Sequence, residues 1–243
     1  MLNLFKFSLV RQVAECMLEF CEYIFFGAAI LLVVFLVFKN FPRDVFRKLL
    51  HLIAFSSLVE MTIAARSWQA ASISALLFAA VVYPLLCLVE KYEWYGRLFV
   101  QKAPGEVKKS LLLLFIMYAA LTAICWGLLD ERFIGMTAVL MWGVGDAAAA
   151  LIGRRFGRHP ATLPLADTHK TFEGSAAMMV FAFAAGVVGL LLTGEYPVGR
   201  CVLYPLIAAP VAAYTELITK NGDDTVTVPV ATAIALTAAS KLF

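Results

Sequence analysis

Long apolar stretches separated by polar segments run through almost the whole chain, and this pattern predicts its helices. An α-helix needs roughly 20 mostly apolar residues to cross the hydrocarbon core of a membrane. Candidate spans lie at residues 22–38, 49–65, 68–89, 110–129, 133–152, 174–193, 201–218 and 228–242. The second and the eighth are short for a complete crossing. The pattern therefore predicts an all-α polytopic membrane protein with about seven or eight transmembrane helices.

Composition supports this fold class and leaves little room for a soluble domain. Hydrophobic residues make up 62% of the 243 residues, and the mean hydropathy is +0.86. A soluble domain has roughly 45–50% apolar residues. Charged residues interrupt residues 1–21, and no small-residue cleavage site follows them, so we expect an amphipathic helix at the membrane surface there. Residues 22–243 are expected to form a single transmembrane catalytic bundle.

The distribution of positive charge predicts the orientation of the spans. Of the 20 Lys and Arg residues, 14 fall in the loops near residues 39–48, 90–109, 153–173 and 219–227. Loops rich in Lys and Arg stay on the cytoplasmic side of a membrane. We therefore expect these four loops to be cytoplasmic and both chain ends to face outward, in a bacterial inner membrane or an organelle membrane.

A segment from Gly143 to Pro160 combines a carboxylate inside the membrane boundary with glycines and arginines. An ionised side chain is costly there, so Asp146 is a candidate functional residue. Carboxylates bind Mg²⁺, whereas arginines and exposed backbone N–H groups bind phosphate. The small residues Ala147–Ala150 indicate close helix packing beside Asp146. The candidate phosphate-binding residues in this segment are Gly145, Gly153, Arg154, Gly157 and Arg158.

Two further segments add candidate residues near the same membrane edge. Lys170 and Glu173 precede Gly174, where the sixth span begins, and a lysine beside a helix N-terminus is suited to phosphate binding. Between the seventh and eighth spans, Glu216 is followed by the acidic pair Asp223 and Asp224. We expect Mg²⁺ at Asp146 together with Asp223 or Asp224, whereas Glu173 and Glu216 either orient the basic groups or hold a second metal ion.

A basic cluster at the start of the second span is the last candidate. Arg47 and His51 are four residues apart and Lys48 and His51 are three apart, so on a helix all three share a face. This cluster either marks the cytoplasmic boundary of the span or belongs to the site.

These motifs resemble those of the CTP-dependent lipid-alcohol kinases, which include phytol, farnesol and dolichol kinases and a diacylglycerol kinase. The similar patterns are G-D-A-x-A-x-x-x-G-R-x-F-G, K-T-x-E-G-S and R-K-x-x-H, and a final pair of acids followed by a proline, here Pro229. The family pattern has asparagine where this chain has Thr225. The resemblance implies transfer of phosphate from CTP to a lipid hydroxyl, with a magnesium ion. Asp224, Glu216 and His51 are alternative general bases for the lipid alcohol.

Two rival functions share some of these features. Phosphatidate cytidylyltransferases resemble the chain around Asp146, but their basic and glycine-rich ending is absent here. A small transporter would also carry polar residues inside the membrane, although these would lie near its midplane rather than at one edge. The expected partners are a lipid alcohol, a nucleoside triphosphate and the membrane, without nucleic acid. The oligomeric state and the identity of the lipid alcohol are not fixed by these patterns.

Overall fold

The structure is a computed structural model that describes residues 43–98, 105–162, 170–220 and 223–243, together with Ala14, Leu18 and Cys21. The regular structure of these residues is helical, apart from one isolated bridge between Pro160 and Thr171. The all-α prediction is therefore confirmed. The expected amphipathic helix at residues 1–21 and the first span at residues 22–38 lie almost entirely outside the described residues.

The fold divides into two compact units, with the boundary between Gly127 and Leu128, and each unit is described by itself. The first contains α2 (Arg43–Ala64), α3 (Trp68–Val89), the short α4 (Glu93–Leu98) and α5 (Glu106–Thr122), which continues as a π-helical turn over Ala123–Leu128. Helices α3 and α5 pack together, and the rings of Phe78 and Phe115 stack with their centroids 4.3 Å apart. A buried hydrogen bond of 2.7 Å between Thr62 and Tyr118 joins α2 to α5.

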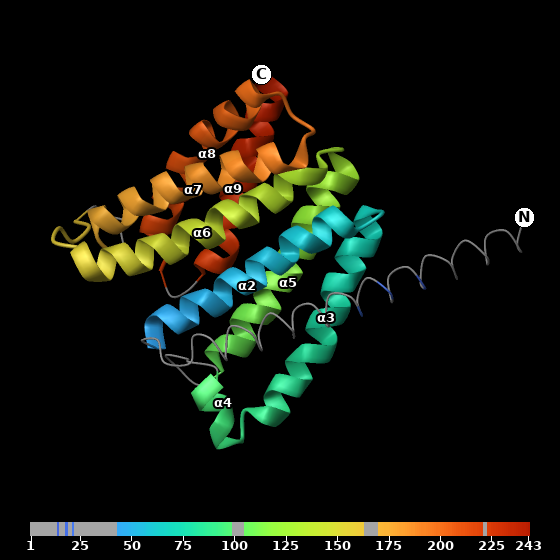
Figure 1. Cartoon of the computed structure of the whole chain (residues 1–243), viewed down its shortest axis with the longest axis vertical. Helices are drawn as coiled ribbons and strands as arrows, with labels where there is room; N and C mark the ends of the chain where they lie inside the picture. The colour runs from blue at the N-terminus through green and yellow to red at the C-terminus, as the bar shows by residue number, and fades with distance from the viewer. Residues whose placement is uncertain are drawn as a thin grey trace, which may run out of the picture. The chain divides into compact units, whose positions relative to one another are not determined.

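The second unit is a bundle of four helices, α6 (Arg132–Phe156), α7 (Phe172–Thr193), α8 (Val198–Ile218) and α9 (Asp224–Leu242) (Figure 1). Helix α6 packs against α7 and α9, and α8 also packs against α7 and α9, so the four helices form a closed ring. Successive helices run in opposite directions. The C-termini of α6 and α8 and the N-termini of α7 and α9 therefore lie at the same end, which we call the polar end, and the opposite end is the far end.

The transmembrane spans predicted from the sequence agree closely with the helices of the described residues. Six helices among the described residues are long and apolar enough to cross a membrane. They are Trp68–Val89, Glu106–Leu128, Arg132–Phe156, Phe172–Thr193, Val198–Ile218 and Asp224–Leu242. Helix α2 contributes the shorter apolar stretch His51–Ala64, where a short span was predicted. The chain is thus a multi-pass α-helical membrane protein.

Glycines allow α6 and α7 to approach each other closely. A Cβ added to Gly145 of α6 would lie 2.4 Å from the sulfur of Met178 on α7. A Cβ added to Gly174 of α7 would lie 3.1 Å from the carbonyl oxygen of Ala149 on α6. Packing between membrane helices depends on such small residues because lipid tails supply no hydrophobic driving force. This contact holds Asp146 of α6 at a fixed place beside α7.

Candidate active site

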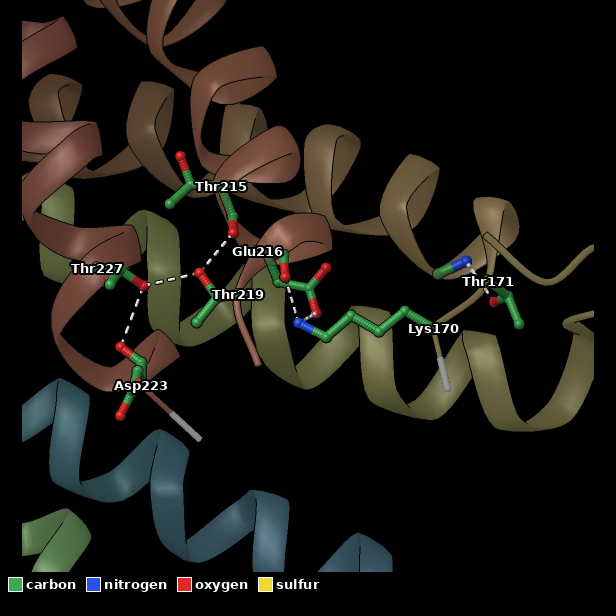
Figure 2. A network of polar contacts seen from close by, with 8 residues as sticks. Lys170, Thr171, Thr215, Glu216, Thr219, Asp223 and Thr227 are labelled. Carbon is green, nitrogen blue, oxygen red and sulfur yellow. Dashed lines mark hydrogen bonds and ion pairs between the residues drawn. The ribbon is translucent and has the colours of Figure 1, made fainter. Parts of the chain in front are cut away.

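An ion pair between Lys170 and Glu216 is the best-defined feature of the polar end (Figure 2). Lys170 directly precedes the capping residue of α7, and its Nζ lies 2.8 Å from Oε1 of Glu216 in the last turn of α8. The same ammonium group donates to the backbone carbonyl of Glu216. A cation at a helix C-terminus is stabilised by the helix dipole. The side chain of Glu216 is only 8% exposed and that of Lys170 20%, so this is a largely buried pair.

Two further carboxylates surround this pair. Asp146 of α6 and Asp224 of α9 both lie close enough to Glu216 to interact with it electrostatically. Both aspartates are half-buried. The structure therefore brings together residues from α6, α8 and α9 and the segment before α7, which are far apart in the sequence. Carboxylates gathered in this way are suited to binding a cation.

The donor set suits a magnesium ion that is shared with a ligand. Within the described ranges, no group of three or more His, Cys, Asp and Glu side chains is close enough to form a complete metal cage. Magnesium usually keeps several water molecules and takes only one or two carboxylates, together with substrate phosphates. Asp146 and Asp224 fit this pattern, and Asp223, which is exposed, stands next to them at the N-cap of α9. Their role as metal ligands stays a prediction.

A chain of threonines fixes the turn that carries the two aspartates (Figure 2). Thr219 at the C-cap of α8 hydrogen-bonds to the carbonyl of Thr215 at 2.7 Å and to the hydroxyl of Thr227 at 2.9 Å. Thr227, in the first turn of α9, in turn hydrogen-bonds to the carbonyl of Asp223 at 3.1 Å. These contacts hold the start of α9 against the end of α8. Thr225, where the family pattern has asparagine, is buried in the same turn.

A short backbone bridge positions Lys170 at the start of α7. The N–H of Ala161 donates to the carbonyl of Lys170 at 2.8 Å, and the N–H of Phe172 donates to the carbonyl of His159 at 3.0 Å. Thr171 caps α7, because its hydroxyl accepts a hydrogen bond from the N–H of Gly174 at 3.2 Å. A phosphate bound at the N–H of Gly174 would have to compete with this cap.

Glu173, in the first turn of α7, contacts His159, which follows the end of α6. Its Oε1 lies 2.6 Å from Nδ1 of His159, and its Oε2 accepts a hydrogen bond of 3.3 Å from the backbone N–H of His159. The predicted roles of Glu173, orienting the basic groups or holding a second metal ion, stay predictions. Sequence reasoning missed His159, although its place directly after Arg158 in the basic loop was the available signal.

The glycines predicted to bind phosphate are also required by the packing of the chain, because a larger residue would not fit there. A Cβ on Gly157 would lie 2.2 Å from the carbonyl oxygen of Gly153, and a Cβ on Gly153 would lie 3.2 Å from Oγ1 of Thr171. Arg154 and Arg158 are exposed at the end of α6 and in the loop that follows it. Phosphate binding by these residues stays a prediction.

The cluster in the second span lies in the first unit. Arg47, Lys48 and His51 all belong to α2, so the predicted helical spacing is present. His51 is half-buried, and its ring centroid is 6.3 Å from that of Phe55. The side chains of Arg47 and Lys48 are outside the described part of the chain. Their participation in the site stays a prediction.

Comparison with known proteins supports the resemblance seen in the motifs. No family model matches the chain, and no solved structure is significantly similar to it. The chain is 29% identical over 214 residues to the phytol kinase of Synechocystis sp., an alignment that covers 83% of this chain and 82% of the relative. It is 31% identical over 178 residues to a probable chloroplastic phytol kinase of Triticum aestivum, covering 66% of this chain and 57% of that protein.

A third relative matches a smaller part of the chain. The probable phytol kinase 1, chloroplastic, of Glycine max is 34% identical over 110 residues, which are 42% of this chain and 35% of that protein. The chain is thus a homologue of proteins named phytol kinase, as its resemblance to the lipid-alcohol kinases predicted.

Proposed function

We propose that this protein transfers the γ-phosphoryl group of a nucleoside triphosphate, CTP, to the hydroxyl of a lipid alcohol of the phytol class. The observation that carries the proposal is the buried Lys170–Glu216 pair with Asp146 and Asp224 beside it at one end of a membrane bundle. Similarity to phytol kinases over most of the chain supports the same reaction. The choice of CTP rests on the resemblance of the motifs.

A site that transfers a phosphoryl group must hold positive charges beside the phosphates of the nucleotide. Phosphoryl transfer depends mostly on positioning the two substrates and neutralising the charge on the transferred group. A magnesium ion held by Asp146 with Asp224 or Asp223 would supply this neutralisation at the nucleotide phosphates. Arg154 and Arg158, exposed at the polar end, are suited to the outer phosphates because their guanidinium groups donate paired hydrogen bonds.

Lys170 is the residue whose contacts must change during the reaction. Its ammonium group is bound to the carboxylate and the carbonyl of Glu216. A bound phosphate offers stronger acceptors than the carbonyl, so we infer that Lys170 turns partly toward the nucleotide while Glu216 keeps its orientation. Glu216 then acts as a positioning residue, and Asp224 is the proposed general base within the second unit.

The lipid substrate is proposed to reach the polar end from the membrane. The helices around the site are apolar enough to lie in the bilayer, so a long isoprenoid chain can stay in the lipid while its hydroxyl reaches Asp224. We propose that the polar end faces the cytoplasm, because the loops beside it are rich in Lys and Arg.

The test follows the two phosphorus positions of CTP in purified protein with phytol. We expect γ-labelled CTP to label the lipid, α-labelled CTP to leave it unlabelled, and Asp224→Ala to abolish transfer. Glu195→Gln, which changes an exposed acid in the turn between α7 and α8, is the matched control and should keep full activity. Label from the α position in lipid would instead indicate cytidylyl transfer to a lipid phosphate carried with the protein, and no lipid label from either position would refute the kinase.

A further inference from the structure

Ser175 carries a buried hydroxyl whose purpose the fold does not explain. It is the fourth residue of α7, and its Oγ is inaccessible to solvent. Among the residues that the structure describes, no atom forms a hydrogen bond with this oxygen. A serine inside a helix can satisfy its hydroxyl by bonding to a carbonyl one turn earlier, but Ser175 does not. A buried hydroxyl without a partner costs free energy, so such a group calls for an explanation.

Helical geometry shows where this hydroxyl faces. Gly186 lies eleven residues after Ser175, which is about three turns of helix, so the two residues share one face of α7. A Cβ on Gly186 would lie 2.8 Å from the sulfur of Met141 on α6 and 2.8 Å from Cβ of Pro205 on α8. This face of α7 therefore points into the bundle, toward the junction of α6 and α8.

The antiparallel register then sets the depth of Ser175 in the bundle. Helices α7 and α8 are antiparallel, and Gly186 on α7 lies against Pro205 on α8. Ser175 is about three turns before Gly186 on α7, and Glu216 is about three turns after Pro205 on α8. Ser175 thus lies at about the same depth in the bundle as Glu216, the partner of Lys170. The carboxylate of Glu216 is bonded to Lys170 and not to Ser175. The hydroxyl therefore shares the depth of the ion pair without being part of it.

We propose that Ser175 is a ligand-binding residue whose hydroxyl donates a hydrogen bond to a phosphate oxygen of the bound nucleotide, next to Lys170. This inference rests on the proposed function and extends it to the uncharged last residue of the K-T-x-E-G-S motif. A phosphate group offers only acceptors, and the serine hydroxyl has a donor that none of the described residues accepts. Binding of the nucleotide would satisfy both groups in a place from which water is excluded.

The experiment measures binding as well as turnover in the full-length protein in detergent. We expect Ser175→Ala to weaken the binding of CDP, measured by calorimetry, about 10-fold or more, as for the loss of a hydrogen bond to a charged group. Ser175→Cys fills nearly the same volume with a weak donor and should show a similar loss. If Ser175→Ala fails to fold, Ser175→Cys decides the question.

The control is Thr137→Val, which removes another buried hydroxyl without a hydrogen-bond partner in the described chain, located two turns before Gly145 on α6 and away from the polar end. It should leave CDP binding unchanged. Unchanged CDP binding in Ser175→Ala or Ser175→Cys would overturn the proposal. So would a loss that appears only when Mg²⁺ is present, since that result would make the hydroxyl a metal ligand.

A second arm separates the nucleotide from the phosphorylated lipid. Phytyl phosphate should bind Ser175→Ala as tightly as the unsubstituted protein, and a loss restricted to phytyl phosphate would contradict the nucleotide assignment. An unsubstituted protein that binds CDP but does not phosphorylate phytol would refute the proposed function and leave the role of Ser175 in nucleotide binding standing. The two hypotheses can therefore fail separately.

Discussion

Replacing Lys170 by methionine tests the buried ion pair most directly. The substitution keeps a long apolar side chain but leaves the carboxylate of Glu216, which is 8% exposed, without its cation. Removing one partner of a buried pair typically costs 3–5 kcal/mol. Because Lys170 itself is 20% exposed and water can reach it, we expect a loss at the lower limit, about 3 kcal/mol in the free energy of unfolding.

A double-mutant cycle isolates the energy of the pair. Glu216→Gln keeps an acceptor for the ammonium group and should cost about 1–2 kcal/mol. The double substitution removes both charges, so it should cost less than the sum of the two single changes by about 2 kcal/mol. A salt bridge at the far end supplies the comparison, because Lys241 lies 3.3 Å from Glu131 but is 57% exposed. Lys241→Met should cost less than about 1 kcal/mol.

Unfolding can be followed through Cys201, which is fully buried in α8. In a variant that keeps only this cysteine, the rate at which a thiol reagent labels it in increasing denaturant reports the opening of the second unit. A Lys170→Met protein as stable as its parent, or a cycle without coupling, would show that the charges do not interact as the structure indicates. Activity gives a second readout, since Glu216→Gln should keep partial activity and Lys170→Met very little.

Three further predictions follow from the site and the fold. Asp146→Asn should keep the fold but lose about 100-fold in rate, equivalent to about 2.7 kcal/mol of transition-state stabilisation, as measured by phytol phosphorylation at several Mg²⁺ concentrations. Gly174→Ala should destabilise the second unit by about 1–3 kcal/mol, because its Cβ would lie 3.1 Å from the Ala149 carbonyl; a normal melting temperature would refute this. In cysteine-free protein on intact cells, an impermeant reagent should label Glu195→Cys but not Leu163→Cys, and the reverse result would invert the topology.

The helices could be predicted from the sequence because a membrane imposes one dominant rule. Every backbone polar group must be satisfied inside the hydrocarbon, so long apolar stretches become helices. The predicted span at residues 68–89 coincides with α3, and the other spans that fall within the described residues differ from their helices by at most six residues at either end. The ends depend on local chemistry that hydropathy ignores. Thr171, for example, caps α7 three residues before the predicted start at Gly174.

The site was harder to predict because its contacts join distant segments. Lys170 and Glu216 are 46 residues apart, and the sequence indicated a separate role for each. Lys170 was predicted to bind phosphate, and Glu216 to orient basic groups or hold a metal ion. Only the antiparallel arrangement of α7 and α8 shows that the two form a pair. Ser175 is the last residue of the K-T-x-E-G-S motif, but no sequence pattern assigned a role to its uncharged hydroxyl, which shows its lack of a partner only in the packed bundle.

The two ends of the bundle show why charge alone does not identify a site. At the far end, the two carboxylate oxygens of Glu131 accept hydrogen bonds from Tyr196 at 3.0 Å and from Lys241 at 3.3 Å. Burial, followed by the nearby Glu131, raises the pKa of Tyr196, so this hydroxyl stays protonated and keeps donating at any ordinary pH. Those contacts join the start of α6, the turn before α8 and the end of α9, and they give one acid two donors from within the protein.

At the polar end, by contrast, acids gather together, because Glu216 interacts with Lys170 and also with two further aspartates. An acid matched by internal donors stabilises a fold, whereas three acids from different helices gathered near Lys170 form the arrangement that we propose holds a magnesium nucleotide.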